Sequence, residues 1–410
     1  MQAFKRLIYI ILLLFPILSL AIDAKEHNFL VIADIHLDLQ LTKPMDFTPS
    51  KQGLGRSGIN DLDLPTFTAM LATISKNIKE GLIPTPRFIL ILGDIGGHRL
   101  LNTTETSGIV FHLLQKNFKD IPIFYTFGNN DSLSVADGPF KAANHAKLNT
   151  PYEIAMQLGQ WKDGFLSTGR HCDKTLIYPC IIEENPTHGY YSAQLEPHLR
   201  MINLNSILLS PQRHLVQPED ASAQLQWFAN QLDQAHTLGE SVLIATHISP
   251  AYNIYDHGLL WIADDYNYFL QLMKKYQSNI ISIHVAHTHQ EELKVLKDKH
   301  GKNIVGMYFT AGLSTCYGNS PSIKSFYFKQ LNQKWVLTNY KTYRFSRIND
   351  QMTLSPLYDF NDYYCLNHEQ SMLQCLNNVT IEKMKKYFTV DNENFSGVIK
   401  FPEDMIINIK

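Results

Sequence analysis

The run Phe88-Ile89-Leu90-Ile91-Leu92-Gly93-Asp94 is apolar until it closes in a glycine and a carboxylate. Apolar runs of this length, without polar alternation, are typical of strands that are covered on both faces of a parallel sheet. The run therefore predicts a buried strand with Asp94 at its carboxyl end. Open α/β sheets place their chemistry at that edge, and the turn that follows carries a second polar side chain, His98.

Four other apolar runs end in the same way, each with Asp, Asn or His just beyond it. Residues two apart on an extended backbone point to the same face, so Asp34 and His36 can bind one ion together, and His287 and His289 form a second pair with this spacing. Two metal ions that share a bridging carboxylate need about seven protein ligands if water completes each shell. The sequence therefore predicts a dinuclear metal centre. Its candidate ligands are Asp34, His36, Asp94, Asn129, His247, His287 and His289.

The composition is that of a large globular chain. Hydrophobic residues make up 45% of its 410 residues and charged residues 18%, enough for one large core with appendages. The formal net charge of -2 shows no basic excess, so we expect neither nucleic acid nor an anionic membrane surface as a partner. No oligomeric state is predicted.

The first 21 residues have the features of a secretory signal peptide. Lys5 and Arg6 precede an apolar run from Leu7 to Leu20, and Ser19 and Ala21 are small residues at the positions that a signal peptidase reads. The run is short for a bilayer span, and an uncleaved anchor is the alternative. We expect residues 1–21 to be removed and the mature protein to be secreted or periplasmic, without stable membrane insertion.

The cysteines fit an oxidising compartment. Cys172 lies close in sequence to Cys180, and Cys365 to Cys375, so each pair can form a disulfide that closes a small loop. Cys316 is left over. We expect it to be a buried free thiol, with pairing to one of the other four as the alternative.

Strand and helix patterns alternate along the chain, as in parallel α/β units. The periodicity is lost between Pro139 and Tyr191, which indicates an insertion near the site. The expected domains are residues 22–345, which contain all candidate ligands, and a small disulfide-stapled C-terminal extension, residues 346–410. Helices are expected from Asp63 to Gly81, from Ile109 to Phe118, from about Leu225 to Gly239 and from about Leu259 to Tyr276.

The blocks around the candidate ligands resemble those of the calcineurin-like metallophosphoesterases. They read DIH, GDIGGH, GNND, a lone H after a strand and AHTH, where that family usually has DxH, GDxxD/H, GNHD/E, H and GHxH. His98 falls where the acid sphingomyelinase-like phosphodiesterase branch has GDxxxH, and Gly318-Asn319-Ser320-Pro321 resembles its GNNP turn. The resemblance covers about residues 28 to 345. It implies a four-layer α/β/β/α sandwich, with two mixed sheets packed face to face and helices outside.

The resemblance also implies how the ligands divide between two divalent ions, for which zinc is the expected metal. In the family the ions polarise the phosphoryl oxygens and activate a bridging water, which attacks phosphorus as hydroxide without a covalent enzyme intermediate. One ion would be held by Asp34, His36 and His289, the other by Asn129, His247 and His287, with Asp94 between them.

Asn130 departs from the family pattern. It stands where most members have a histidine that assists the leaving group, and an amide cannot donate a proton as an acid. His98 is the nearest candidate for that role, with a turn histidine in solvent as the alternative. The GNND block also resembles endopolyphosphatase members, which keep Asn, so Asn130 does not by itself predict an inactive protein.

The implied function is hydrolysis of phosphodiester or phosphoanhydride bonds in small soluble substrates, such as nucleotides or nucleotide-linked choline. Sphingomyelinases carry a saposin-like domain ahead of the catalytic one, whereas here the first metal block follows the expected signal by a few residues, so a bilayer lipid is the less expected substrate. Polyphosphate hydrolysis, sphingomyelin-type lipid hydrolysis and a non-catalytic metal-binding role are the alternatives.

Overall fold

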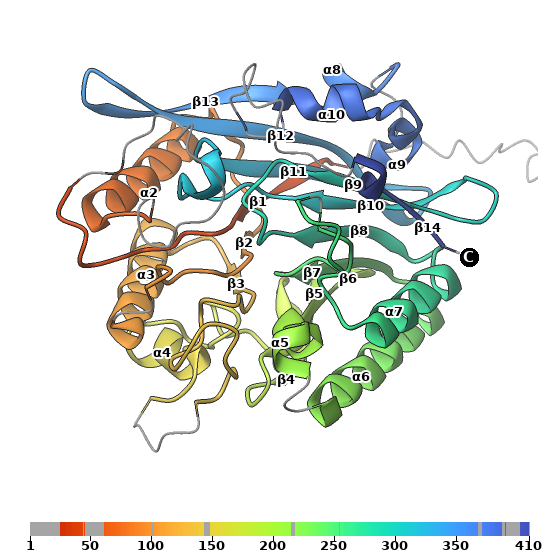
Figure 1. The fold of residues 1–410 in the computed structure, drawn as a ribbon, viewed down its shortest axis with the longest axis horizontal. Helices are drawn as coiled ribbons and strands as arrows, with labels where there is room; N and C mark the ends of the chain where they lie inside the picture. The colour runs from red at the N-terminus through yellow and green to blue at the C-terminus, as the bar shows by residue number, and fades with distance from the viewer. Residues whose placement is uncertain are drawn as a thin grey trace, which may run out of the picture.

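The protein is an α/β sandwich of two mixed sheets. The computed structural model describes residues 25–43, 45, 61–99, 102–142, 148–214, 218–253, 255–367, 371–387, 390 and 402–409; the expected signal peptide lies outside them. Within these residues one six-stranded and one eight-stranded sheet pack face to face, and helices cover their outer sides (Figure 1). The predicted fold class is confirmed.

The first sheet has the strand order β13-β12-β11-β1-β2-β3. Its parallel half, β1 to β3, consists of the short apolar runs that the sequence predicts as buried strands. The C-terminal part of the chain forms its antiparallel half, β11 to β13. The strands are β1 (His27–Ile32), β2 (Ile89–Ile91), β3 (Ile123–Tyr125), β11 (Ser322–Leu331), β12 (Lys334–Ile348) and β13 (Gln351–Asp359).

The second sheet has the order β14-β9-β10-β8-β7-β6-β5-β4. Strands β6, β7, β8 and β10 are parallel to one another, and antiparallel pairs flank them. The strands are β4 (Cys180–Asn185), β5 (Tyr190–Glu196), β6 (Leu199–Leu204), β7 (Ser241–Thr246), β8 (Ile280–Val285), β9 (Leu293–Lys297), β10 (Asn303–Phe309) and β14 (Ile406–Asn408).

The longer helices follow the sequence signals, with shifts at their first turns. The side chain of Asp63 caps α2 by accepting a hydrogen bond from the backbone of Thr66, as expected of an N-cap residue. Helix α3 begins at Thr103, six residues before the predicted start at Ile109. Its first turns are polar, so apolar periodicity does not reveal them. The longer helices are α2 (Leu64–Lys79), α3 (Thr103–Asn117), α6 (Pro218–Thr237) and α7 (Ala263–Lys275).

The insertion between Pro139 and Tyr191 contains α4 (Pro151–Gln157) and the edge strand β4. Helix α4 starts with a capping box, in which Thr150 and Glu153 each accept a hydrogen bond from the other's backbone. A disulfide joins Cys172 to Cys180. The expected staple of this insertion is confirmed.

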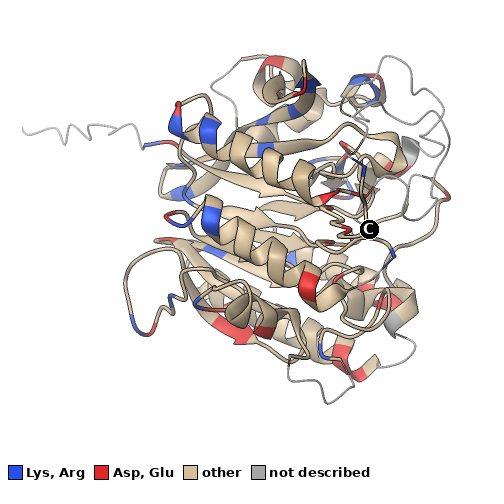
Figure 2. Ribbon diagram, turned by 90° about the vertical axis from the view of Figure 1, so that its left-hand side faces the viewer, with Lys and Arg blue, Asp and Glu red and all other residues tan. Residues whose placement is uncertain are grey.

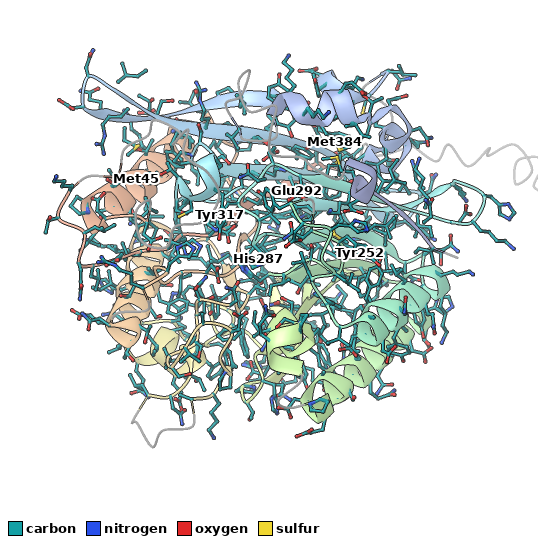
Figure 3. The ribbon with its side chains drawn as sticks, viewed as in Figure 1. Met45, Tyr252, His287, Glu292, Tyr317 and Met384 are labelled. Carbon is teal, nitrogen blue, oxygen red and sulfur yellow. A yellow bond between two sulfur atoms is a disulfide. The ribbon has the colours of Figure 1, made fainter. Side chains whose placement is uncertain are left out.

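Aromatic side chains of the two sheets contact one another, and Figure 3 shows side chains crowded throughout the body of the molecule. His284 of β8 is fully buried there, with its ring centroid 5.3 Å from that of Phe29 in β1 and 4.5 Å from that of Phe326 in β11. His284 is therefore a core residue. The two sheets meet with the carboxyl ends of β1, β2, β3, β7 and β8 at one edge.

The C-terminal segment is an integral part of the sandwich. Strand β12 crosses the expected boundary between residues 345 and 346, and β13 adds an edge strand to the first sheet. The helices beyond residue 359 are stapled by the disulfide Cys365–Cys375, as predicted, and Cys316 is a buried free thiol. The short helices are α5 (Pro211–His214), α8 (Phe360–Tyr364), α9 (Met372–Cys375), α10 (Ile381–Tyr387) and the 3₁₀ turns η1 (Ser206–Leu209), η2 (Cys316–Gly318), η3 (Leu376–Asn378) and η4 (Pro402–Met405).

Charged residues lie scattered over the helices and loops in the view of Figure 2, with both signs present. Among the described residues, no helix combines the length and the apolar character that crossing a membrane requires.

Candidate metal centre

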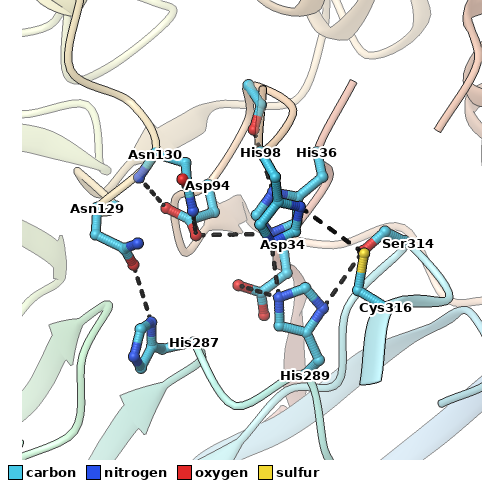
Figure 4. Close-up of polar contacts among 12 residues, drawn as sticks. Asp34, His36, Asp94, His98, Asn129, Asn130, His287, His289, Ser314 and Cys316 are labelled. Carbon is cyan, nitrogen blue, oxygen red and sulfur yellow. Dashed lines mark hydrogen bonds and ion pairs between the residues drawn. The ribbon is translucent and has the colours of Figure 1, made fainter. Parts of the chain in front are cut away.

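The structure brings all seven candidate ligands together at the edge where five strands end; Figure 4 labels all of them except His247. Strands β1, β2 and β3 of the first sheet and β7 and β8 of the second deliver them. The most deeply placed are Asp34, His36 and His247, which are fully buried. The site therefore straddles the two sheets.

One group of donors consists of Asp34, His36 and His289. The Nε2 atoms of His36 and His289 are 3.1 Å apart, and His289 Nε2 is 3.8 Å from Asp34 Oδ1. His36 Nε2 also lies 3.5 Å from Asp94 Oδ2. Donor atoms that share a divalent ion lie roughly 3 Å apart, since each is about 2 Å from the ion. These atoms are close to that arrangement.

The second group consists of Asn129, His247 and His287. Asn129 Oδ1 is 2.9 Å from His287 Nδ1 and 3.0 Å from His247 Nε2. His247 Nε2 is 3.4 Å from Asp94 Oδ1, whereas the other Asp94 oxygen faces the first group. Each oxygen of Asp94 thus faces a different set of donors, as a bridging carboxylate would.

Hydrogen bonds fix the tautomers of two of these histidines. His36 Nδ1 donates to the carbonyl of Gly96 at 3.1 Å, and His247 Nδ1 donates to the carbonyl of Leu92 at 2.6 Å. Because a carbonyl only accepts, Nδ1 carries the hydrogen in both rings, and in the neutral imidazole Nε2 presents a lone pair to the site.

The charges of the site fit divalent cations. Asp34 is fully buried, yet neither of its carboxylate oxygens has a hydrogen-bond partner within the described residues. Burial raises the pKa of Asp34 to about 8, and it lowers the pKa values of His36 to about 3 and of His287 to about 4. Burial alone would also lower the pKa of His247, but the adjacent Asp94 carboxylate raises it to about 10, so metal binding there would release a proton. The neutral imidazoles of His36 and His287 are the form that binds metals, and a cation would compensate the Asp34 carboxylate.

The backbone at the site is strained. Five of the seven candidate ligands have left-handed backbone conformations, which cost about 1–2 kcal/mol for a residue other than glycine and concentrate at functional sites. The extended backbone that we expected to align Asp34 with His36 is therefore absent; both residues converge by left-handed turns instead. The φ values are 45° for Asp34, 47° for His36, 54° for Asp94, 74° for His287 and 61° for His289.

Two glycines allow the loops after β2 and β3 to touch. Gly93 has φ of +87°, and a Cβ at this position would lie 2.6 Å from the backbone nitrogen of Gly128. A Cβ at Gly128 would lie 2.3 Å from the backbone nitrogen and from Oδ1 of Asp94. The glycines that end the two apolar runs are thus required by this close approach.

Asn130 forms two hydrogen bonds with Asp94. Its backbone nitrogen donates to Asp94 Oδ1 at 2.8 Å, and its side-chain Nδ2 donates to Oδ2 at 2.7 Å. Asp131, which sequence reasoning left out, accepts hydrogen bonds from the backbone nitrogens of Asp94, Ile95 and Gly128 at 2.7–2.9 Å. Both residues therefore position Asp94. The last letter of the GNND block was the available signal for Asp131.

His98 lies beside the first group of donors and is held by a partner that the sequence did not reveal. Its Nδ1 is 2.6 Å from Asp61 Oδ1, and its ring stacks on that of His36 with a centroid distance of 3.9 Å. Burial by itself would lower the pKa of His98, but hydrogen bonds with Asp61 and Cys316 raise it to about 11. Its side chain is only 17% exposed, so it is not a turn histidine in solvent.

Known proteins resemble this chain over the region that carries the site. The model of the calcineurin-like phosphoesterase family matches residues 27–291, more than half of the chain and all seven candidate ligands. Sphingomyelin phosphodiesterase 2 of Caenorhabditis elegans is 24% identical over 255 residues, which cover 59% of this chain and 37% of that protein.

Two further relatives are phosphodiesterases by name. Sphingomyelinase phosphodiesterase C of Dictyostelium discoideum is 26% identical over 314 residues, covering 70% of this chain and 63% of that protein. The cyclic GMP-AMP phosphodiesterase of Mus musculus is 28% identical over 151 residues, 34% of each chain. The matched part of this chain thus covers between about a third and somewhat less than two thirds of the length of each of these relatives.

Proposed function

Because the chain belongs to the calcineurin-like phosphoesterase family, we propose that it is a metal-dependent hydrolase that cleaves phosphodiester or phosphoanhydride bonds of small phosphorylated substrates. The observation that carries the proposal is the convergence of seven donor side chains from five strand ends; one of them, the buried carboxylate of Asp34, has no hydrogen-bond partner among the described residues. The names of the relatives make a phosphodiester the first substrate class to test.

Two divalent cations occupy the site in this proposal, and zinc is the first candidate because imidazoles dominate the donor set. When bound, such cations supply Lewis acidity at the phosphoryl oxygens and make water a nucleophile at neutral pH. The protein holds them with the two groups of donors described above: Asp34, His36 and His289, then Asn129, His247 and His287, with Asp94 between the groups.

His98 is the general acid in this proposal. Asp61 occupies its Nδ1 and stabilises the imidazolium, and no hydrogen bond to Nε2 is present within the described residues. Nε2 can therefore deliver a proton to the leaving-group oxygen. Asn130 has a different role, because it binds both oxygens of Asp94 and is a positioning residue.

The activity is tested with an aryl phosphodiester and protein of known metal content, with Asp94→Asn as the control. Turnover that depends on bound metal, and that Asp94→Asn abolishes together with metal binding, supports the proposal. A metal-loaded protein without turnover would instead be a non-catalytic relative. A panel of nucleotides, nucleotide-linked choline, polyphosphate and sphingomyelin vesicles then identifies the substrate. Polyphosphate is included because Asn130 stands where the endopolyphosphatase-like GNND block has its Asn.

The role of His98 is tested by comparing leaving groups. His98→Ala should slow substrates with poor, alkyl leaving groups by roughly a hundredfold or more, because these need a proton. Hydrolysis of nitrophenyl esters should slow much less in His98→Ala. Asp61→Asn should likewise slow alkyl substrates more than nitrophenyl esters, since it removes the charge that stabilises the imidazolium. Equal losses on both substrate types would mean that His98 only binds substrate.

We also propose an extracytoplasmic location. The two disulfides support it, as does the signal-like segment of residues 1–21. The N-terminal sequence of the mature protein from its native source tests this: a start shortly after Ala21 is expected, and a cytoplasmic protein with all cysteines reduced would contradict it.

A further inference from the structure

A second cluster of metal-binding side chains lies in the insertion, apart from the metal centre. Asp163, His171 and Glu184 each place one ligand atom within 4.8 Å of the other two, and His171 Nε2 is 3.2 Å from Asp163 Oδ2. They come from three segments: the turn after α4, the residue next to Cys172, and strand β4. Figure 1 shows α4 and β4 in its lower part. None of them takes part in the site proposed above.

The two carboxylates of this cluster share one hydrogen-bond donor. Tyr152 Oη is 3.3 Å from Asp163 Oδ2 and also 3.3 Å from Glu184 Oε1. A phenol has a single hydrogen, so it donates to only one of them at a time. The second oxygen of Glu184 is buried and has no hydrogen-bond partner within the described residues.

The only lysine or arginine among the causes that shift the pKa of Glu184 is Lys174, and it forms no ion pair with either carboxylate of the cluster within the described residues. Asp163 is 3% exposed, and its Oδ1 is used by the backbone nitrogens of Phe165 and Leu166. Within the described part of the chain no lysine or arginine forms an ion pair with Asp163 or Glu184. Two neighbouring, partly buried carboxylates repel each other unless a cation or a proton lies between them.

We propose that Asp163, His171 and Glu184 form a third divalent-cation site, in which one imidazole nitrogen and two carboxylate oxygens bind a transition-metal ion of the zinc class. The imidazole favours such ions over calcium and magnesium, which prefer oxygen ligands alone. Water completes the coordination. The site joins β4, the Cys172–Cys180 loop and the turn after α4, so its role is to stabilise the insertion.

The test is a metal count on the full chain with its disulfides intact, dialysed after incubation with a small excess of zinc. Wild type should retain one zinc ion per chain more than Glu184→Gln and one more than His171→Asn, variants that nearly conserve side-chain shape. Asp173→Asn, a neutralised exposed acid in the same loop, is the matched control and should bind as much as wild type.

Affinity and stability provide independent readouts. In a zinc titration, Glu184→Gln should weaken the extra site at least about tenfold, since even ligand-supporting residues cost that much when lost. Excess zinc should raise the unfolding temperature of wild type more than that of Glu184→Gln, in which only the metal centre still binds zinc. Aryl phosphodiester hydrolysis should be unchanged in Glu184→Gln, because the residue lies outside the metal centre.

The same comparison in an Asp94→Asn background separates this site from the metal centre. A difference of one ion between Asp94→Asn and the double variant Asp94→Asn/Glu184→Gln supports the third site even if the proposed hydrolase activity fails. Equal metal contents in wild type, Glu184→Gln and His171→Asn would overturn the proposal. They would mean that a proton, carried by His171 or by one of the carboxylates, neutralises the cluster.

Discussion

Gly128 lies where the loops after β2 and β3 touch, and Gly128→Ala tests whether this contact positions Asp94. The new Cβ would lie 2.3 Å from the backbone nitrogen and from Oδ1 of Asp94. The backbone of Gly128 is not left-handed, so the substitution introduces a steric conflict without a conformational one.

The size of the effect follows from these distances. Real Cβ contacts essentially never fall below 3.0 Å, so the 2.3 Å contact must lengthen. The needed shift of about 0.7 Å exceeds the ~0.2 Å tolerance of metal–ligand distances several times. We expect loss of at least one metal ion and a drop in kcat/KM of roughly a hundredfold, as for misplacements of this order. Overpacking should also cost about 1–3 kcal/mol of stability.

The assay measures metal content after dialysis, kcat/KM on an aryl phosphodiester, and the unfolding temperature. Gly81→Ala is the control: Gly81 has φ of +76°, and a Cβ added there would have no neighbour within 4 Å, so alanine adds only backbone strain of about 1 kcal/mol. The control should keep its metal and its activity. If Gly128→Ala behaves like Gly81→Ala in all three measurements, the loop contact does not position Asp94.

The metal centre and the core support three further predictions. Removal of divalent metals with a chelator should abolish hydrolysis and zinc should restore it; activity that survives at no measurable metal content would contradict the proposed chemistry. Asp131→Asn should raise the activation free energy, taken from kcat/KM, by more than it lowers the free energy of unfolding, because Asp131 accepts a hydrogen bond from the backbone nitrogen of Asp94. An unchanged kcat/KM would refute that role. Burial lowers the pKa of His284 to about 3, so the unfolded chain binds this proton first as pH falls from about 6.5. As the pH falls from about 6.5 to 4.5, the free energy of unfolding of wild type should therefore decrease by about 2 kcal/mol more than that of His284→Leu. If the two free energies change in parallel with pH, His284 is protonated in the folded state.

The strands of the site, and the candidate ligands at their ends, were predictable because they depend on local pattern. A buried parallel strand is an uninterrupted apolar run, and the residue after it lies at the active edge whatever the rest of the chain does. Asp94 and His247 are examples. The cap of α2 was equally local, since Asp63 and Thr66 lie within one turn.

The supporting residues were not predictable because long-range contacts define them. Asp61 acts on His98 from 37 residues away, and nothing in its own neighbourhood distinguishes it from a loop carboxylate. The left-handed turns at Asp34 and His36 are imposed by the site and have no glycine to mark them. Helix α4 had a local signal, the capping box from Thr150 to Glu153, that reasoning from apolar periodicity passes over.

The spread of the ligands along the chain sets an order of events during biosynthesis. Asp34 and His36 leave the ribosome early, whereas His289 follows about 250 residues later, a delay of roughly 13–50 s at ordinary rates of translation. Until then the second sheet is incomplete, and the first group of donors lacks its third member. In the proposed dinuclear site, capture of both ions therefore waits at least until His289 has been made, and a nascent chain that stalls before His289 cannot capture the full pair.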